Sequence, residues 1–219
     1  MAVTDCTGNT ANVTLNIAFA VFVGVVGSFL GYEPTSYKDA VTCNEREKWI
    51  EAMDKEHNQM DDLGVFEYVA RSSVPRGTKI ISSKWVFKIK PDKYKARLVI
   101  RGFLQNDEGL ETFSPTLKSV TFRLLIALAA YFGLYIQAMD VSGAFLNATL
   151  DTDVYMECVD GYEKPGQVIR LKRALYGLRN SPREWYNLLR TYLRSLGLEP
   201  CTLDACLFTL EVNNRVVYW

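Results

Sequence analysis

The stretch from Tyr135 to Leu146 constrains the fold most, because a short apolar segment there delivers one carboxylate and then turns sharply. Tyr135–Val141 has the length and composition of a β-strand, and the Ser-Gly pair that follows ends it. Asp140 therefore falls near the carboxyl end of a strand, where loops commonly carry functional sites. An Asp in this position is also typical of a turn or a cap. The rest of the chain has to distinguish these two interpretations.

The charge of the chain is balanced overall but unevenly distributed. The 219 residues are 48% hydrophobic and 23% charged, an ordinary globular composition, so we expect one domain or one domain with a small appendage. A formal net charge of zero argues against a uniformly basic nucleic-acid binder. However, Arg71–Arg101 contains ten Lys or Arg against the single acid Asp92, whereas Glu45–Glu67 contains eight acids. The sequence predicts a basic strand region beside an acidic helix.

Val13–Leu30 is the one segment that resembles a membrane span, since it is almost continuously apolar. It is short for a span, lacks a basic flank before it, and lacks a cleavage site, which supports neither an anchor nor a secretory signal. A connector or a buried segment is the alternative to a membrane role. We therefore expect residues 1–32 to form an apolar connector or N-terminal extension, with no membrane partner. Five scattered cysteines and a single histidine indicate a reducing compartment, no disulfide framework and no zinc site.

Periodicity predicts a mixed α and β chain. Tyr37–Leu63 carries apolar residues at the spacing of one helical face and is followed by Gly64. His57 lies on or beside that face, and we expect a partly buried histidine without a catalytic role. Three strands follow: Val65–Ala70, Thr78–Lys90 and Lys95–Phe103. Apolar and basic residues alternate in the last two, which predicts a half-buried sheet whose basic outer surface either binds phosphate groups or protects an edge against strand addition.

The second half of the chain predicts two further helices and several short strands. Val120–Leu134 is strongly apolar and is expected to be a core helix. Ser181–Leu196 begins with Ser as the N-cap and Pro at the first helical position. The remaining predicted strands are Val154–Glu157, Val168–Leu171, Ala205–Val212 and Arg215–Trp219, the last two forming a hairpin. The predicted fold class is α+β.

Six separated blocks of the sequence carry a recognisable ordered pattern. They are Glu33–Tyr37 with Trp49–Met53, Lys84–Lys88, Lys95–Val99, Glu111–Pro115, Asp140–Leu146 and Leu175–Tyr186. Together they resemble the reverse transcriptase domain of copia-type LTR retrotransposons, a region of a gag-pol polyprotein. No single block is specific, but the ordered set covers the chain from about residue 33 to its end.

The resemblance implies the fingers and palm of a right-hand polymerase over residues 33–219, with an antiparallel palm sheet backed by helices and incomplete at the C-terminus. It implies an RNA-directed DNA polymerase that transfers deoxynucleotides to a primer 3′-OH with two magnesium ions. The partners would be an RNA or DNA template with a primer, deoxynucleoside triphosphates and the other parts of the gag-pol polyprotein. The expected location is intracellular, in a cytoplasmic particle or the nucleus.

The resemblance also assigns roles near the predicted strand end. Magnesium prefers hard oxygen ligands, and Asp140 matches the catalytic first metal ligand, with the Val141 carbonyl as an additional oxygen. Phe145 matches the steric gate, a ring under the sugar that would exclude a 2′-hydroxyl. The alternative for Phe145 is a core aromatic residue beside a turn.

Other matched positions would bind substrate and nucleic acid. Arg97, with Lys88 or Lys95, would meet the incoming triphosphate from the finger strands, because a guanidinium fork fits phosphate oxygens. Arg183 is either a contact to the nucleic-acid backbone or a surface charge. The residues that match the loop and helix start beside the templating base pair are Tyr176, Gly177, Ser181 and Pro182.

Two departures from the family pattern affect the expected activity. The loop between the finger strands is short, Lys90–Tyr94, which limits its reach to the triphosphate. The other two catalytic aspartates of the family lie on a Tyr-x-Asp-Asp hairpin that would begin just past Trp219. Because one aspartate cannot hold two metal ions, we expect little or no polymerase activity from these residues alone. The alternatives are a noncatalytic nucleic-acid or nucleotide-binding remnant that uses Lys84–Arg101, and an unstable remnant whose last strand pairs with other chains.

Overall fold

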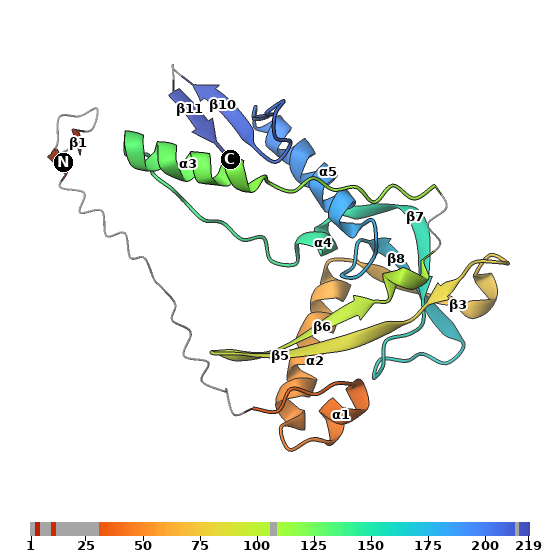
Figure 1. Cartoon of the computed structure of the whole chain (residues 1–219). Helices are drawn as coiled ribbons and strands as arrows, with labels where there is room; N and C mark the ends of the chain where they lie inside the picture. Colours follow the sequence, from red (N-terminus) through yellow and green to blue (C-terminus); the bar gives the residue numbers. More distant parts are fainter. Residues whose placement is uncertain (1–2, 5–9, 12–30, 106–108, 213–214) are drawn as a thin grey trace. The chain divides into compact units, whose positions relative to one another are not determined.

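The computed structural model describes residues 3–4, 10–11, 31–105, 109–212 and 215–219 (Figure 1). The chain divides into two units, Met1–Gly31 and Tyr32–Trp219. In the first unit, β1 (Val3–Thr4) pairs antiparallel with β2 (Thr10–Ala11). Val13–Leu30, with its predicted connector role, lies outside the described residues. Among the described residues, no helix is both long enough and apolar enough to cross a membrane.

The helix predicted over Tyr37–Leu63 is in fact two helices, α1 (Tyr37–Thr42) and α2 (Arg46–Asp62). Ser36 caps α1, because its Oγ accepts a hydrogen bond of 3.2 Å from an amide in the first turn. The chain then leaves the helical conformation at Cys43, where the backbone is extended. The apolar spacing continues across this break, which is why the pattern alone did not reveal it.

Six strands make up the sheet structure around α2. They are β3 (Phe66–Ala70), β4 (Ile80–Ile81), β5 (Ser83–Lys90), β6 (Lys93–Ile100), β7 (Thr149–Met156) and β8 (Gln167–Arg173). Four of them form a sheet in the order β3-β8-β7-β4, antiparallel except for the parallel pair β4 and β7. β5 and β6 form an antiparallel ribbon. The predicted strand Thr78–Lys90 is interrupted at Ser82, because the Ile81 carbonyl accepts from Glu157 whereas the Ser82 carbonyl accepts from Arg101.

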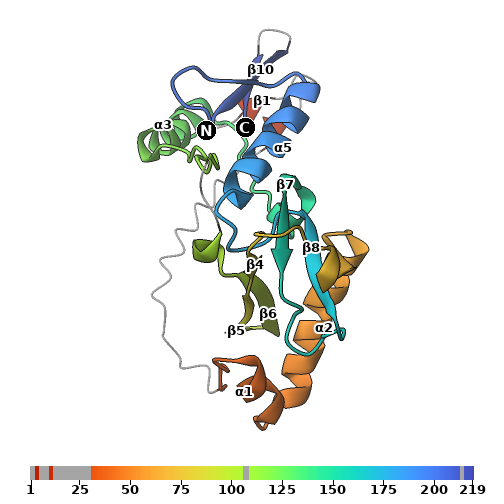
Figure 2. The same ribbon diagram turned by 90° about the vertical axis from the view of Figure 1, so that its right-hand side faces the viewer.

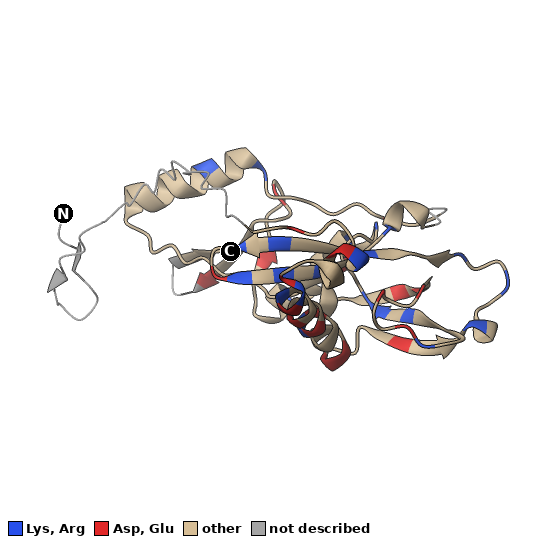
Figure 3. Ribbon diagram, turned by 90° about the horizontal axis from the view of Figure 1, so that it is seen from below, with Lys and Arg blue, Asp and Glu red and all other residues tan. Residues whose placement is uncertain are grey.

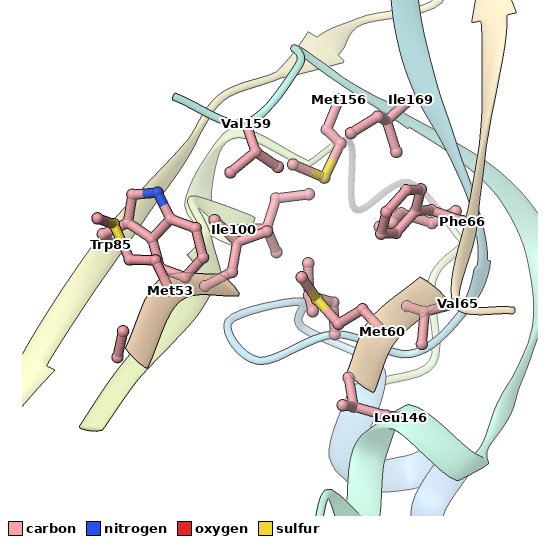
Figure 4. Close-up of a cluster of buried hydrophobic side chains, with 14 of the residues drawn as sticks. Met53, Met60, Val65, Phe66, Trp85, Ile100, Leu146, Met156, Val159 and Ile169 are labelled. Atoms are coloured by element: carbon pink, nitrogen blue, oxygen red, sulfur yellow. The ribbon is translucent and has the colours of Figure 1, made fainter. Parts of the chain in front are cut away.

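The alternation predicted for β5 and β6 is confirmed. Trp85, Phe87, Leu98 and Ile100 are buried, while the β5 lysines Lys84, Lys88 and Lys90 are exposed. α2 covers the buried face (Figures 1 and 2) with its own apolar stripe. The resulting core, shown in Figure 4, joins α2 and the ribbon to the four-stranded sheet through Met53, Met60, Val65, Phe66, Met156, Val159 and Ile169.

The remaining elements are three helices and three strands. They are α3 (Ser119–Phe132), α4 (Ala144–Asn147), α5 (Ser181–Ser195), β9 (Glu199–Pro200), β10 (Phe208–Val212) and β11 (Arg215–Tyr218). β10 pairs antiparallel with both β11 and β9, which confirms the predicted hairpin. Leu193, Leu198 and Phe208 form a second, small buried cluster.

Two predictions about the middle of the chain are wrong. Tyr135–Val141 forms no strand in the part of the chain that the structure describes, and its apolar side chains are exposed instead of buried against a sheet. The helix predicted over Val120–Leu134 exists as α3, but Ala129 is its one buried residue, so it is not a core helix. Apolar composition predicted burial for both segments, and no described part of the chain covers them.

Candidate active site

Asp140 lies in an exposed connection between α3 and the short helix α4. Gly143 allows the turn after it, because its φ of +63° is a left-handed conformation that favours glycine. The turn is closed by the Asn147 side chain, whose Nδ2 donates to the Gly143 carbonyl at 3.1 Å. Leu146 is buried and fixes α4 to the core. Asp140 and the exposed Val141 therefore precede a turn that is anchored on its C-terminal side.

Phe145, Tyr176 and Arg97 lie together, with the Tyr176 ring in contact with both of the others. The rings of Phe145 and Tyr176 meet edge to face with centroids 5.1 Å apart, and the Arg97 guanidinium lies 5.5 Å from the Tyr176 ring centroid. Burial raises the pKa of the Tyr176 hydroxyl; Arg97 opposes this shift, while the negative charges of Glu56 and Asp140 add to it. Tyr176 thus experiences the charges of both Arg97 and Asp140.

Gly177 allows the loop after β8 to touch the ribbon. The Ile100 amide donates to the Tyr176 carbonyl at 2.9 Å. A Cβ atom on Gly177, whose φ is +96°, would lie 2.1 Å from the Ile100 carbonyl oxygen. Gly102 makes the same kind of approach from the other side, since a Cβ atom on it would lie 2.0 Å from the Gly177 carbonyl oxygen. This close approach holds Tyr176 beside Arg97.

Lys88 and Lys95 face each other across β5 and β6. Lys88 binds Glu33, whose carboxylate oxygen lies 3.0 Å from its Nζ. Glu33 also accepts the Ile89 amide, and this bond together with Lys88 lowers the pKa of the Glu33 carboxyl. Partial burial and the neighbouring Arg97 lower the pKa of Lys95. Figure 3 shows the cations along β5 and β6 in blue and the acids on α2 in red.

Ser181, Pro182 and Arg183 lie at the start of α5 and hold neighbouring segments. Asn180 is the N-cap, so the prediction of Ser181 as the cap is wrong; the Ser181 Oγ donates instead to the Leu175 carbonyl at 2.7 Å. The Pro182 carbonyl accepts a hydrogen bond of 3.1 Å from Ser114 Oγ. Arg183 lies near three carboxylates, those of Glu111 at 2.9 Å, Glu184 at 2.8 Å and Asp151 at 3.7 Å.

Glu56 is a residue that the sequence did not single out. It lies on the face of α2 that packs against the ribbon and is only 9% exposed. Burial raises the pKa of its carboxyl, against the effect of Lys95 and Arg97. Glu56 lies at helical spacing from Trp49, Met53 and Met60, and this spacing indicated that it shares their buried face. The many acids of the helix obscured that signal.

Magnesium is the metal that the family implies, and the described residues do not complete a site for it. No group of three or more His, Cys, Asp or Glu that could hold a metal ion occurs in the part of the chain that the structure describes. Asp140 offers one carboxylate, and a two-metal centre needs several.

Comparisons with known proteins point to one family. The family described as reverse transcriptase (RNA-dependent DNA polymerase) matches residues 65–218. The retrovirus-related Pol polyprotein from transposon TNT 1-94 of Nicotiana tabacum is 34% identical over 199 residues, which are 84% of this chain and 15% of that protein. The corresponding polyprotein from transposon RE1 of Arabidopsis thaliana is 34% identical over 83% of this chain and 13% of its own length.

A third relative is the transposon Ty1-LR2 Gag-Pol polyprotein of Saccharomyces cerevisiae, 33% identical over 78% of this chain and 10% of its own length. The chain thus spans about 15% or less of the length of these relatives. The family match over residues 65–218 includes the ribbon, the Asp140 connection and α5. The chain therefore belongs to the reverse transcriptase family, in the copia-type branch of retrotransposon Pol polyproteins.

Proposed function

We propose that residues 33–219 are the fingers and palm of an RNA-directed DNA polymerase, which extends a primer on an RNA or DNA template with deoxynucleoside triphosphates. The observation that carries this proposal is the contact of Arg97 and Phe145 with Tyr176, whose hydroxyl pKa is raised by burial and, to a smaller extent, by the negative charge of Asp140. A guanidinium can neutralise phosphate oxygens, while a pair of rings offers a surface for a sugar and a base. Three of the proposed substrate-binding residues therefore lie together.

Each residue of this group has a proposed task. Arg97 binds the triphosphate, assisted by Lys95 and Lys88, and Phe145 lies under the sugar as the steric gate. Tyr176 orients both through its ring contacts, and Gly177 lets the loop approach. Ser181, Pro182 and Arg183 shape the helix start beside the template. Asp140, with the Val141 carbonyl, supplies oxygen ligands for magnesium.

The metal requirement decides how the activity is tested. Since no group of three or more possible metal ligands occurs among the described residues, we expect primer extension only when a longer region of the polyprotein supplies additional acidic ligands. The experiment measures incorporation of dTTP on a poly-rA template with a DNA primer. It compares the 219-residue chain, a longer version of the same polyprotein region, and the longer version with Asp140→Asn. Incorporation by the longer version that survives Asp140→Asn contradicts the proposal.

A noncatalytic nucleic-acid-binding remnant is the second candidate function. It is favoured by the register of the ribbon, in which Lys88 faces Lys95 and Lys90 faces Lys93, because opposed like charges destabilise a sheet. Glu33 pairs with Lys88 and Asp92 with Lys93, whereas Lys90 and Lys95 make no ion pair with a described residue and are available to an anion. This candidate predicts oligonucleotide binding that weakens steeply with salt and is unchanged by Asp140→Asn. Polymerase activity in the longer version excludes it as the sole function.

A further inference from the structure

Glu56 is a buried acid on the apolar face of α2. It is 9% exposed and lies in line with Trp49, Met53 and Met60, which pack into the core. Its Oε1 atom is buried and has no hydrogen-bond partner among the described residues. A buried carboxyl oxygen without a partner is unfavourable, and an apolar side chain would avoid that penalty. The carboxyl group therefore indicates a role that an apolar side chain could not perform.

The carboxyl group of Glu56 takes the place of a neighbouring strand at one edge of β6. β5 is the one strand that pairs with β6 in the part of the chain that the structure describes, so the other edge of β6 needs different partners. Amides two residues apart on a strand point to the same edge. At this edge the Leu98 amide donates to the Glu56 carboxyl. The Ile100 amide donates to the Tyr176 carbonyl at 2.9 Å. Two groups outside the ribbon therefore hold this edge of β6.

The edge that Glu56 holds lies next to Arg97 in the chain. Arg97 is exposed and stands between the buried residues Ala96 and Leu98, because successive side chains of a strand point to opposite faces. The charges of Glu56 and Arg97 also act on each other, and that of Glu56 acts on the Tyr176 hydroxyl. The place of the Arg97 guanidinium, 5.5 Å from the Tyr176 ring centroid, therefore depends on where α2 holds β6.

We propose that Glu56 is a positioning residue for Arg97: its buried carboxyl group holds the edge of β6 at Leu98, and this contact directs the guanidinium to the substrate. The inference rests on the proposed function for the task of Arg97. Glu56 itself does not touch the substrate and acts through the backbone of β6. Because the contact with the Leu98 amide needs an acceptor and not a charge, glutamine should replace Glu56, whereas methionine, which is of similar length, should not.

The first test is primer extension with dTTP on poly-rA by the longer polyprotein region. Glu56→Met is compared with Glu56→Gln and with Glu51→Met, the same substitution at an exposed position of α2. We expect Glu56→Met to raise the KM for dTTP about fivefold, with kcat and the KM for the primer–template nearly unchanged, and the other two variants to stay within about twofold of the parent. A lower kcat together with a higher KM for the primer–template indicates a structural role and overturns the proposal. An unchanged KM for dTTP in Glu56→Met, or an equal rise in Glu56→Gln, overturns it as well.

A double variant decides whether Glu56 acts through Arg97. Glu56→Met is combined with Arg97→Ala in the longer polyprotein region, and the KM for dTTP is measured for the double variant and for each single variant. The double variant should have the same KM as Arg97→Ala alone, because no guanidinium remains to be positioned. If the two increases in KM multiply instead, Glu56 acts on the site by another route and the proposal is overturned.

Hydrogen exchange of the 219-residue chain, measured for single amides by NMR, separates this inference from the proposed function. Exchange of the Leu98 amide should be at least about tenfold faster in Glu56→Met than in Glu56→Gln, while exchange of the Ile100 amide, which Tyr176 holds, should differ by less than about threefold. If the longer region extends no primer but Leu98 exchange shows this difference, the proposed function fails and the contact of Glu56 with β6 stands. If primers are extended and Leu98 exchanges equally in the two variants, the positioning role fails alone.

Discussion

Gly177 occupies a position where a side chain would meet the backbone of the ribbon. Any Cβ atom there would lie 2.1 Å from the Ile100 oxygen and 2.8 Å from Val99 Cγ1, and the residue has a positive φ as well. The contact also places Tyr176 against Arg97. Substitution at Gly177 is therefore expected to affect stability and the candidate site together.

Gly177→Ala is expected to lower the free energy of unfolding by roughly 2–4 kcal/mol, because it adds a backbone clash to the strain of a positive φ. Urea denaturation measures the loss. Gly166→Ala is the control, since Gly166 has a φ of +72° but no atom within 4 Å of an added Cβ; its cost is expected to be about 1 kcal/mol. Equal losses in the two variants would show that the close approach does not contribute.

Arg183 has two competing interpretations that a substitution separates. Its side chain is 26% exposed and its guanidinium lies among three carboxylates, of which the Glu184 side chain is only 10% exposed. Arg183→Ala leaves that carboxylate without its partner and is expected to destabilise the fold by about 1–3 kcal/mol in urea denaturation. Arg190→Ala, on the exposed side of α5, is the control and should be nearly neutral. Normal stability with weaker oligonucleotide binding would instead identify Arg183 as a backbone contact.

The sequence could name Arg97, Tyr176 and Phe145 from their motifs, but not the contact between them. That contact depends on two glycines from distant segments, and glycine in a sequence does not reveal which backbone it approaches. Glu56 was missed for a different reason. A glutamate in an acidic helix predicts a solvated side chain, and only the packing of α2 on β6 shows that this one is buried.

At the level of elements, alternation predicted β5 and β6 well because each has one buried and one exposed face. The strand predicted over Tyr135–Val141 from length and composition is wrong, because this segment pairs with no strand among the described residues. A segment becomes a β-strand only when it hydrogen-bonds to another strand, and amino-acid composition does not show whether such a partner is present. The break between α1 and α2 was missed because apolar spacing carries no information on backbone conformation at Cys43.

The loop between β7 and β8 is held on α2 by aromatic and polar contacts. Tyr162 stacks on His57 with ring centroids 4.0 Å apart, and its hydroxyl donates to Asp54. Burial lowers the pKa of His57 below its usual value of 6.5, although Asp61 and Asp54 act in the opposite direction. The folded state therefore favours the neutral imidazole.

This contact predicts a loss of stability in mild acid. Because the His57 pKa is lower in the folded state, its contribution is fully present above about pH 6.5 and is lost as pH falls from there toward the folded-state pKa. His57→Phe keeps the stacking and removes the proton, so the variant should lose less stability than the parent between pH 7.5 and 5.5 in urea denaturation. The free energy of unfolding is compared between the two proteins at each pH, because the raised pKa of the Glu56 carboxyl stabilises both of them as pH falls. Parallel pH profiles would contradict the prediction.

The whole molecule exposes an unusual amount of apolar surface around α3. Phe122 is 55% exposed, Tyr131 82% and Tyr135 90%, and the exposed side chains continue onto Val216 and Val217 of β11. Phe122, Tyr135, Val216 and Val217 also line a hollow of about 530 Å³ between α3 and β11. Contiguous surfaces of this kind associate with other apolar surfaces, so the isolated chain is expected to associate with itself.

Sedimentation velocity over a concentration series should show a sedimentation coefficient that rises with concentration. Phe122→Ser combined with Tyr131→Ser should shift this association to higher concentrations, whereas Phe103→Ser, an exposed phenylalanine outside the α3 surface, should not. Sodium sulfate should strengthen the association of the parent protein, because excluded salts favour apolar burial and screen ionic contacts. If sulfate weakens the association and the α3 double variant does not change it, the basic ribbon is responsible for the association instead of the α3 surface.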